Sequence, residues 1–181
     1  ARGPVAVMMP TPLDWNFAAL ITHTRFTLAN RNAQGMIDQA VGRGIAVLNA
    51  APYSGGVLAK GQAHHKRYVY QDASPEMLEP ITRIESVCAK YNIPPGAAAL
   101  QFSLRDTRVA STICGISRPE RIGQKLDWGS DAITAAAWDE WMELPYESGD
   151  QEASRFDKHG ETQQGRRIER TLLHGYGRGC T

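Results

Sequence analysis

The sequence contains little cysteine, little net charge and no long apolar run. Its three cysteines, Cys88, Cys114 and Cys180, are widely spaced and odd in number, which indicates free thiols in a reducing compartment rather than a disulfide framework. A net charge of +1 argues against nucleic-acid binding, which needs concentrated basic charge. No stretch approaches the roughly 20 apolar residues of a membrane span, and the run at residues 5–9 is too short for a signal peptide. We therefore expect a cytoplasmic protein without nucleic-acid or membrane partners.

The length of 181 residues is enough for one sizeable core and a tail. Apolar periodicity continues to about residue 146. From residue 147 it disappears, and residues 155–181 are rich in Gly, Arg and Gln. The sequence therefore predicts one domain over residues 1–146 and a polar, disordered tail over residues 147–181.

Short apolar runs alternate with helical spacing along the domain. Residues 18–22, 45–48 and 109–114 predict three strands, the last two of them buried on both faces. Apolar spacing predicts helices over residues 33–41, 97–104 and 134–144, the first ending at Gly44. Another helix is predicted to start at Ser74-Pro75-Glu76 and to run to residue 91, with its regular part beginning nearer Glu79 because of Pro80. Trp138 and Trp141 on the helix over residues 134–144 are expected in the core. Strands separated by helices indicate an α/β fold with a parallel sheet or barrel.

The most informative segment follows the third predicted strand. Gly115 lets the backbone turn, and Ser117 and Glu120 have the S-x-x-E spacing of a capping box. Arg118 and Arg121 add positive charge where the helix dipole already favours an anion. This pattern predicts a phosphate site at a helix that starts near Ser117. An ordinary capped helix with solvated arginines explains the same residues equally well.

Two other clusters are weaker. His64 and His65 could ligate a metal, but adjacent histidines do not easily reach one ion and no third ligand is spaced nearby. We predict no metal site, and a metal-assisted hydrolase remains a minor alternative. Cys114 at a strand end has no histidine partner in the sequence, and we expect a buried structural thiol.

Three segments carry a resemblance to a known family. They are LITHTRFTL at residues 20–28, GIAVLNAAPYSGGVL at 44–58 and GISRPERI at 115–122. In this order they resemble strands six to eight of the aldo-keto reductases, closest to the branch of the D-threo-aldose and L-fucose dehydrogenases, and the likeness covers roughly residues 3–144. The resemblance implies a partial (β/α)8 TIM barrel containing only its C-terminal βα units. It also implies an oxidoreductase that oxidises a sugar or reduces a carbonyl by hydride transfer with NAD or NADP.

The resemblance also implies which residues contact the cofactor. His23 stands where the family commonly has a glutamine that holds the nicotinamide carboxamide, although a histidine satisfied by neighbours inside a barrel is an equal alternative. Gly115 stands where many NADP users have a lysine, while Arg118 and Arg121 favour a 2′-phosphate, so the choice between NAD and NADP stays open. The implied set for the pyrophosphate loop and the adenosine end is Pro52, Tyr53, Ser54, Gly56, Leu58, Gly115, Ser117, Arg118, Arg121 and Gln124.

No catalytic residue is predicted in this chain. The family's Asp, Tyr, Lys and His lie on earlier strands, and Tyr53, Tyr68 and Tyr70 lie outside its tyrosine motif. We expect a fragment that is inactive alone, since general acid–base catalysis supplies roughly 10²–10⁴-fold of rate. Two hypotheses stay open: the cofactor-binding part of an aldo-keto reductase, or a non-catalytic partial barrel that binds nucleotides or self-associates through open strand edges.

Overall fold

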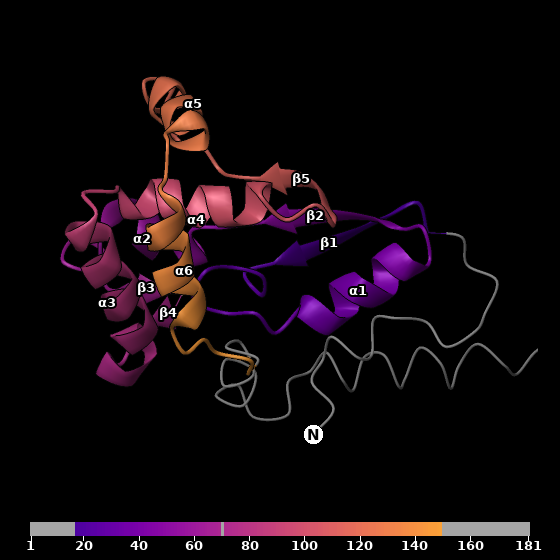
Figure 1. Ribbon diagram of the computed structural model, residues 1–181, viewed down its shortest axis with the longest axis horizontal. Coiled ribbons are helices and arrows are strands. Elements are labelled where there is room, and N and C mark those ends of the chain that lie inside the picture. The colour runs from indigo at the N-terminus through magenta and orange to yellow at the C-terminus, as the bar shows by residue number, and fades with distance from the viewer. Residues whose placement is uncertain (1–16, 70, 150–181) are drawn as a thin grey trace, which may run out of the picture. The chain divides into compact units, whose positions relative to one another are not determined.

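The computed structural model describes residues 17–69 and 71–149, and their central feature is a parallel sheet (Figure 1). Its strands are β1 (Ala19–His23), β2 (Ala46–Ala50) and β5 (Val109–Ile113), in the order β1-β2-β5. The connection from β1 to β2 runs through α1 (Gln34–Gly42), and α3 (Pro75–Lys90) and α4 (Pro95–Leu104) lie between β2 and β5 in the chain. This arrangement confirms the three predicted strands and the alternation of strand and helix.

Shorter elements complete the described part. Two short strands, β3 (Arg67–Tyr68) and β4 (Gln71–Asp72), pair antiparallel in a region where the sequence showed no periodicity and no strand was predicted. The signal was weak because each strand has two residues and, of the four, only Tyr68 is apolar; Tyr68 is fully buried. The remaining elements are η2 (Ser54–Gly56), α2 (Val57–Lys60), α5 (Arg121–Ser130) and α6 (Ala135–Glu143).

Helix ends follow local chemistry, with one correction. Gly44 follows α1 with a φ of 71°, in the left-handed region that favours glycine, as predicted. The helix predicted to start at Ser74-Pro75-Glu76 does so, since α3 begins at Pro75, but the prediction that its regular part begins only near Glu79 was wrong. The Ser74 side chain accepts a hydrogen bond from the Met77 N–H and caps the first turn. That cap, and the burial of Pro80 against the core, outweigh the one backbone donor that Pro80 removes.

The two faces of the sheet differ in burial. Side chains alternate along each strand, so Thr22, Asn49 and Thr112 face the helices, where Asn49 is fully buried. On the opposite face, here called the open face, Ile21 is 58% exposed and Ile113 is 44% exposed. The prediction that β5 is buried on both faces was therefore wrong for the described residues. β-branched composition follows local strand preference and does not report whether a second layer covers the strand.

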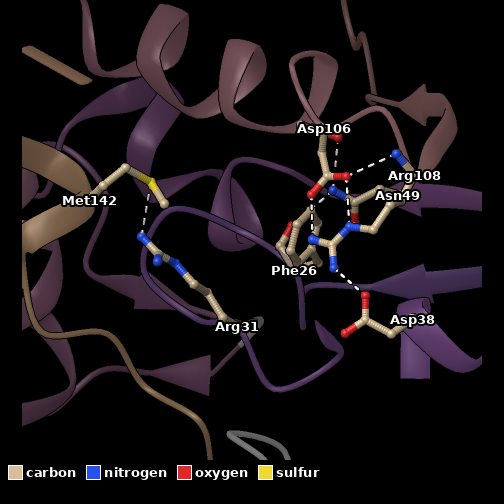
Figure 2. A network of polar contacts seen from close by, with 8 residues as sticks. Phe26, Arg31, Asp38, Asn49, Asp106, Arg108 and Met142 are labelled. Carbon is tan, nitrogen blue, oxygen red and sulfur yellow. Dashed lines mark hydrogen bonds and ion pairs between the residues drawn. The ribbon is translucent and has the colours of Figure 1, made fainter. Parts of the chain in front are cut away.

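Helices α1 and α4 pack against the other face, next to β2 and β5, and α3 packs on α4 and α6. Trp138 and Trp141 of α6 are both buried, as predicted, and α4 is buried along nearly its whole length. Figure 2 shows Arg108 between Asp38 of α1 and Asp106, with Nη1 2.5 Å from Asp38 Oδ1 and Nη2 2.6 Å from Asp106 Oδ2. Hydrogen bonds from Arg108 lower the pKa of Asp106. This clamp ties α1 to the loop that leads into β5.

Two sequence expectations fall at the margins of the described part. The apolar run at residues 5–9 and nearly all of the predicted tail lie outside the described residues. The start of that tail is described: Glu147 forms a parallel bridge with Asn30. Each helix in the described ranges is too short or too polar to cross a membrane.

Candidate functional site

The last residues of β1, β2 and β5 lie side by side at the carboxyl end of the sheet. Register pairs His23 with Ala50 and Ala50 with Ile113, and alternation puts all three side chains on the open face. His23 and Ile113 are exposed, and the small side chain of Ala50 lies between them. We call these three residues the open row. In α/β folds with parallel strands, ligands bind at this end of the sheet.

The loop after β2 turns its side chains inward. Pro52, Tyr53, Ser54 and Leu58 are all buried, and the Ser54 hydroxyl lies 3.2 Å from the Thr27 hydroxyl. Gly55 and Gly56 have φ values of 75° and 104°, which let the backbone make this tight turn. The side chains that the resemblance assigned to the pyrophosphate are thus engaged inside the protein. What this loop can offer a ligand is its backbone around Gly56.

The segment after β5 differs from the predicted capping box. The helix α5 begins at Arg121 rather than near Ser117, and its N-cap, Glu120, has helical dihedral angles and no side-chain cap. The Arg121 N–H donates to the Arg118 carbonyl and the Ile122 N–H to the Pro119 carbonyl, so a backbone turn takes the place of the cap. The predicted capping box was wrong for this reason.

The two arginines of this segment nevertheless lie close together in the chain at the start of α5. Arg118 lies just before the first turn and Arg121 opens it, and both are exposed. Gly115, Ser117 and Gln124 are exposed as well, and the space around Gly115 is open. Two guanidinium groups at the positive end of a helix form an arrangement suited to an anion.

Sequence reasoning missed Lys125, a half-buried residue of α5 one helical turn after Arg121. Its Nζ is 3.7 Å from the centroid of the Tyr53 ring and 4.1 Å from that of the Trp128 ring. Burial, together with the charge of Arg121, lowers the pKa of Lys125 to about 8. Burial and the neighbouring Cys114 raise the pKa of Tyr53. We call Lys125, Tyr53, Trp128 and Cys114 the Lys125 cluster.

Only part of that cluster left a signal in the sequence. Lys125 and Trp128 are three residues apart on α5 and so share one face, which could have been recognised. Tyr53 reaches them from the loop after β2, a contact that no local pattern encodes. Cys114, expected to be buried, is only half-buried.

No metal site emerges in the part of the chain that the structure describes. There, no three His, Cys, Asp or Glu side chains lie close enough together to hold an ion. His65 Nε2 is 3.3 Å from the Gly55 carbonyl oxygen, and the neighbouring His64 is exposed. A metal-assisted hydrolase built on these two histidines therefore finds no third ligand among residues 17–69 and 71–149.

The sequence matches the model of the Aldo/keto reductase family over residues 9–145. This chain belongs to that family. Over 96 residues it is 33% identical to a pyridoxal 4-dehydrogenase of Microbacterium luteolum, covering 53% of this chain and 28% of that protein. Over 121 residues it is 29% identical to a D-threo-aldose 1-dehydrogenase of a Pseudomonas species, covering 66% of this chain and 37% of that protein. The chain thus spans well under half the length of these relatives.

Solved structures agree on the fold. The apo form of an aldo-keto reductase from Bacillus halodurans superposes with a TM-score of 0.54 at 17% identity, over 78% of this chain and 48% of that one. Its holo form gives the same TM-score. The fold is of the (β/α)8 type, and the chain covers part of it, which confirms the resemblance seen in the sequence.

Aldo-keto reductases use NAD or NADP, and the described residues can be compared with that group. His23 is exposed in the open row, and Arg118, Arg121 and Gln124 are exposed at the start of α5. The buried Ser54 hydroxyl, already in contact with Thr27, does not reach outward. The residues that fit a nicotinamide cofactor are therefore those of the open row and of the start of α5. The loop after β2 can contribute only its backbone.

Proposed function

We propose that this chain supplies the cofactor-binding side of an NAD(P)-dependent oxidoreductase that oxidises an aldose or reduces a small carbonyl compound. The observation that carries the proposal is that the parallel sheet brings His23, at the end of β1, and the paired arginines, after β5, to the same end of the strands. The βα units would be those of strands six to eight. The names of both curated relatives, dehydrogenases of an aldose and of pyridoxal, support a small sugar or aldehyde as substrate.

Each group has a role suited to its place. The exposed imidazole of His23 can donate one hydrogen bond to the nicotinamide carboxamide. Arg118 and Arg121 can pair with phosphate oxygens at the adenosine end, where Gln124 lies one helical turn away. The cofactor, when bound, supplies the hydride acceptor or donor. The protein groups named here bind and orient it.

Arg121→Ala is expected to weaken adenine-nucleotide binding by about 1.5–3 kcal/mol, the free energy of a hydrogen bond to a charged group. Titration of the full chain with AMP and with 2′-phospho-AMP, at low and high salt, measures this loss and reports cofactor choice. Arg43→Ala, an exposed arginine at the end of α1, is the matched control and should leave binding unchanged. Equal binding by the wild type and the Arg121 variant would show that this helix start is not the anion site.

We further propose that no acid–base residue for the reaction lies among the described residues. Tyr53 and Lys125 are neighbours, but Lys125 lies over the ring of Tyr53, and the pKa of Tyr53 is raised. A tyrosine that exchanges protons near neutral pH needs the opposite shift. Tyr53 therefore serves packing rather than proton transfer.

The chain is accordingly expected to bind nucleotide without turnover. Incubation of the full chain with NAD or NADP and L-fucose or D-arabinose at alkaline pH should produce no absorbance at the wavelength of the reduced cofactor. A parallel binding titration keeps this test informative, because it separates a binding module from an unfolded chain. Robust turnover would place the missing proton-transfer group inside these 181 residues.

A further inference from the structure

His65 packs on the loop after β2, which the family resemblance assigns to the cofactor's pyrophosphate. Its Nε2 lies 3.3 Å from the Gly55 carbonyl oxygen. The same Nε2 would be 3.6 Å from a Cβ at Gly56, so the ring lies directly against the Gly55–Gly56 turn. Because a carbonyl oxygen can only accept, the imidazole donates this hydrogen bond through an Nε2–H. His65 is therefore connected to a loop of the candidate site.

The turn that His65 contacts has an unusual backbone. Ala51 and Ser54 have φ values of 57° and 51°, and Gly55 and Gly56 follow with 75° and 104°. Residues other than glycine adopt such angles only where the surrounding contacts hold them. The Ser54 hydroxyl provides one such contact, with the Thr27 hydroxyl. The shape of the loop therefore depends on side chains from other parts of the fold.

The peptide group between Gly55 and Gly56 is held at both ends. The Gly56 N–H donates to the Tyr53 carbonyl oxygen at 2.9 Å, and the Gly55 carbonyl accepts from His65. Because a peptide group is planar, hydrogen bonds at its N–H and at its carbonyl fix the direction of the whole plane. Between two glycines, rotation of this plane meets little steric resistance once the His65 bond is removed. His65 therefore selects one orientation of the turn.

Backbone hydrogen bonds hold the segment that carries His65. The Gly61 carbonyl accepts from the N–H groups of His64 and His65, at 3.1 and 3.0 Å. The Val69 N–H donates to the Ser54 carbonyl at 3.5 Å, next to the turn. His64 shares the backbone contact of His65, but its side chain is exposed. His64 is therefore a matched control for the imidazole of His65.

We propose that His65 is a positioning residue for the pyrophosphate of a nicotinamide dinucleotide. This inference rests on the proposed function and adds a residue that the resemblance does not assign. The imidazole acts through the Gly55 carbonyl and orders the loop before the ligand arrives. A loop that is already ordered loses less conformational entropy on binding, so affinity rises without a direct contact between His65 and the cofactor. The adenosine end, assigned to Arg118 and Arg121, does not depend on this loop.

Titration of the full chain with ADP-ribose and with AMP tests this role, because ADP-ribose carries a pyrophosphate and AMP carries one phosphate. His65→Ala should raise the Kd for ADP-ribose about three- to tenfold, the factor expected for one net hydrogen bond, and leave the Kd for AMP nearly unchanged. His65→Gln, whose amide N–H can donate to the same carbonyl, should restore ADP-ribose binding. His64→Ala should match the wild type with both ligands.

Retained AMP binding shows that each variant is folded. Equal Kd values for ADP-ribose in the wild type and in His65→Ala, or equal weakening of both ligands, would overturn the role of His65 and leave the proposed function standing. A wild type that binds neither ligand would instead overturn the proposed function, and this role with it. Long-range proton–nitrogen NMR of the free protein should show a proton on Nε2 of His65, and a ring protonated on Nδ1 alone would contradict the hydrogen bond to Gly55.

Discussion

Replacing Gly96 by alanine is expected to destabilise the protein by about 2–4 kcal/mol, because a methyl group at this position has no room. A Cβ on Gly96 would overlap Cζ3 and Cη2 of the Trp128 ring. Both residues are buried, so the indole ring must leave its place on α4 to admit the methyl. Urea unfolding followed by circular dichroism measures the loss, and tryptophan fluorescence reports the displaced ring.

The same substitution elsewhere provides the control. Gly35 lies in α1 with nothing within 4 Å of its would-be Cβ. Gly35→Ala should stabilise the protein by about 0.5–1 kcal/mol, the gain of helix propensity. Opposite signs for the two glycine-to-alanine changes would support the contact with Trp128 as the cause of the loss at Gly96. A stabilising Gly96→Ala would mean that α5 does not pack on α4 in this way.

This contact also connects stability to the candidate site. The Gln101 side-chain amide donates to the carbonyls of Trp128 and Asp131, at 2.8 Å each, and so holds the end of α5. Arg121 stands at the other end of the same helix. Displacement of Trp128 by Gly96→Ala should therefore weaken nucleotide binding as well, although residue 96 is remote from the arginines in sequence.

The sequence predicted well what local patterns control. Apolar runs and helical spacing located β1, β2, β5, α1 and α6 within a residue or two, because strand and helix preferences are set by neighbouring residues in the chain. The cap at Thr134, which accepts from the Ala137 N–H, lies where the last predicted helix began. The resemblance extended these local predictions to a family, which the match over residues 9–145 confirms.

The failures share a different cause. The S-x-x-E pattern at Ser117 is compatible with a capping box. It is equally compatible with the observed turn, in which the carbonyls of Arg118 and Pro119 accept the first helical N–H groups. The sequence alone does not distinguish the two. Burial of β5 depends on what covers its open face, which lies beyond any local window. Likewise Tyr53 meets Lys125 only after the loop from β2 and the helix α5 have folded together.

Asn49→Leu is expected to cost about 2–3 kcal/mol of stability, although leucine is apolar and branches at the same carbon. Asn49 is fully buried on β2, and its Nδ2 donates to the Phe26 carbonyl and to the Ser103 hydroxyl, both at 2.8 Å. Leucine leaves both acceptors without this donor inside the core. Asn49 and Phe26 appear together in Figure 2. Denaturant unfolding measures the loss in free energy of unfolding, and the m-value is expected to stay unchanged.

A double-mutant cycle separates the hydrogen bond from the change of shape. Ser103 keeps a second partner, since its hydroxyl lies 2.6 Å from that of Thr112. The hydrogen bond between Asn49 and Ser103 is lost in either single variant, so the double variant Asn49→Leu with Ser103→Ala should cost about 1 kcal/mol less than the sum of the single variants. Strict additivity would place the whole penalty on the Phe26 carbonyl. That carbonyl belongs to the loop after β1, so the Asn49 amide also fixes the chain that follows His23 in the open row.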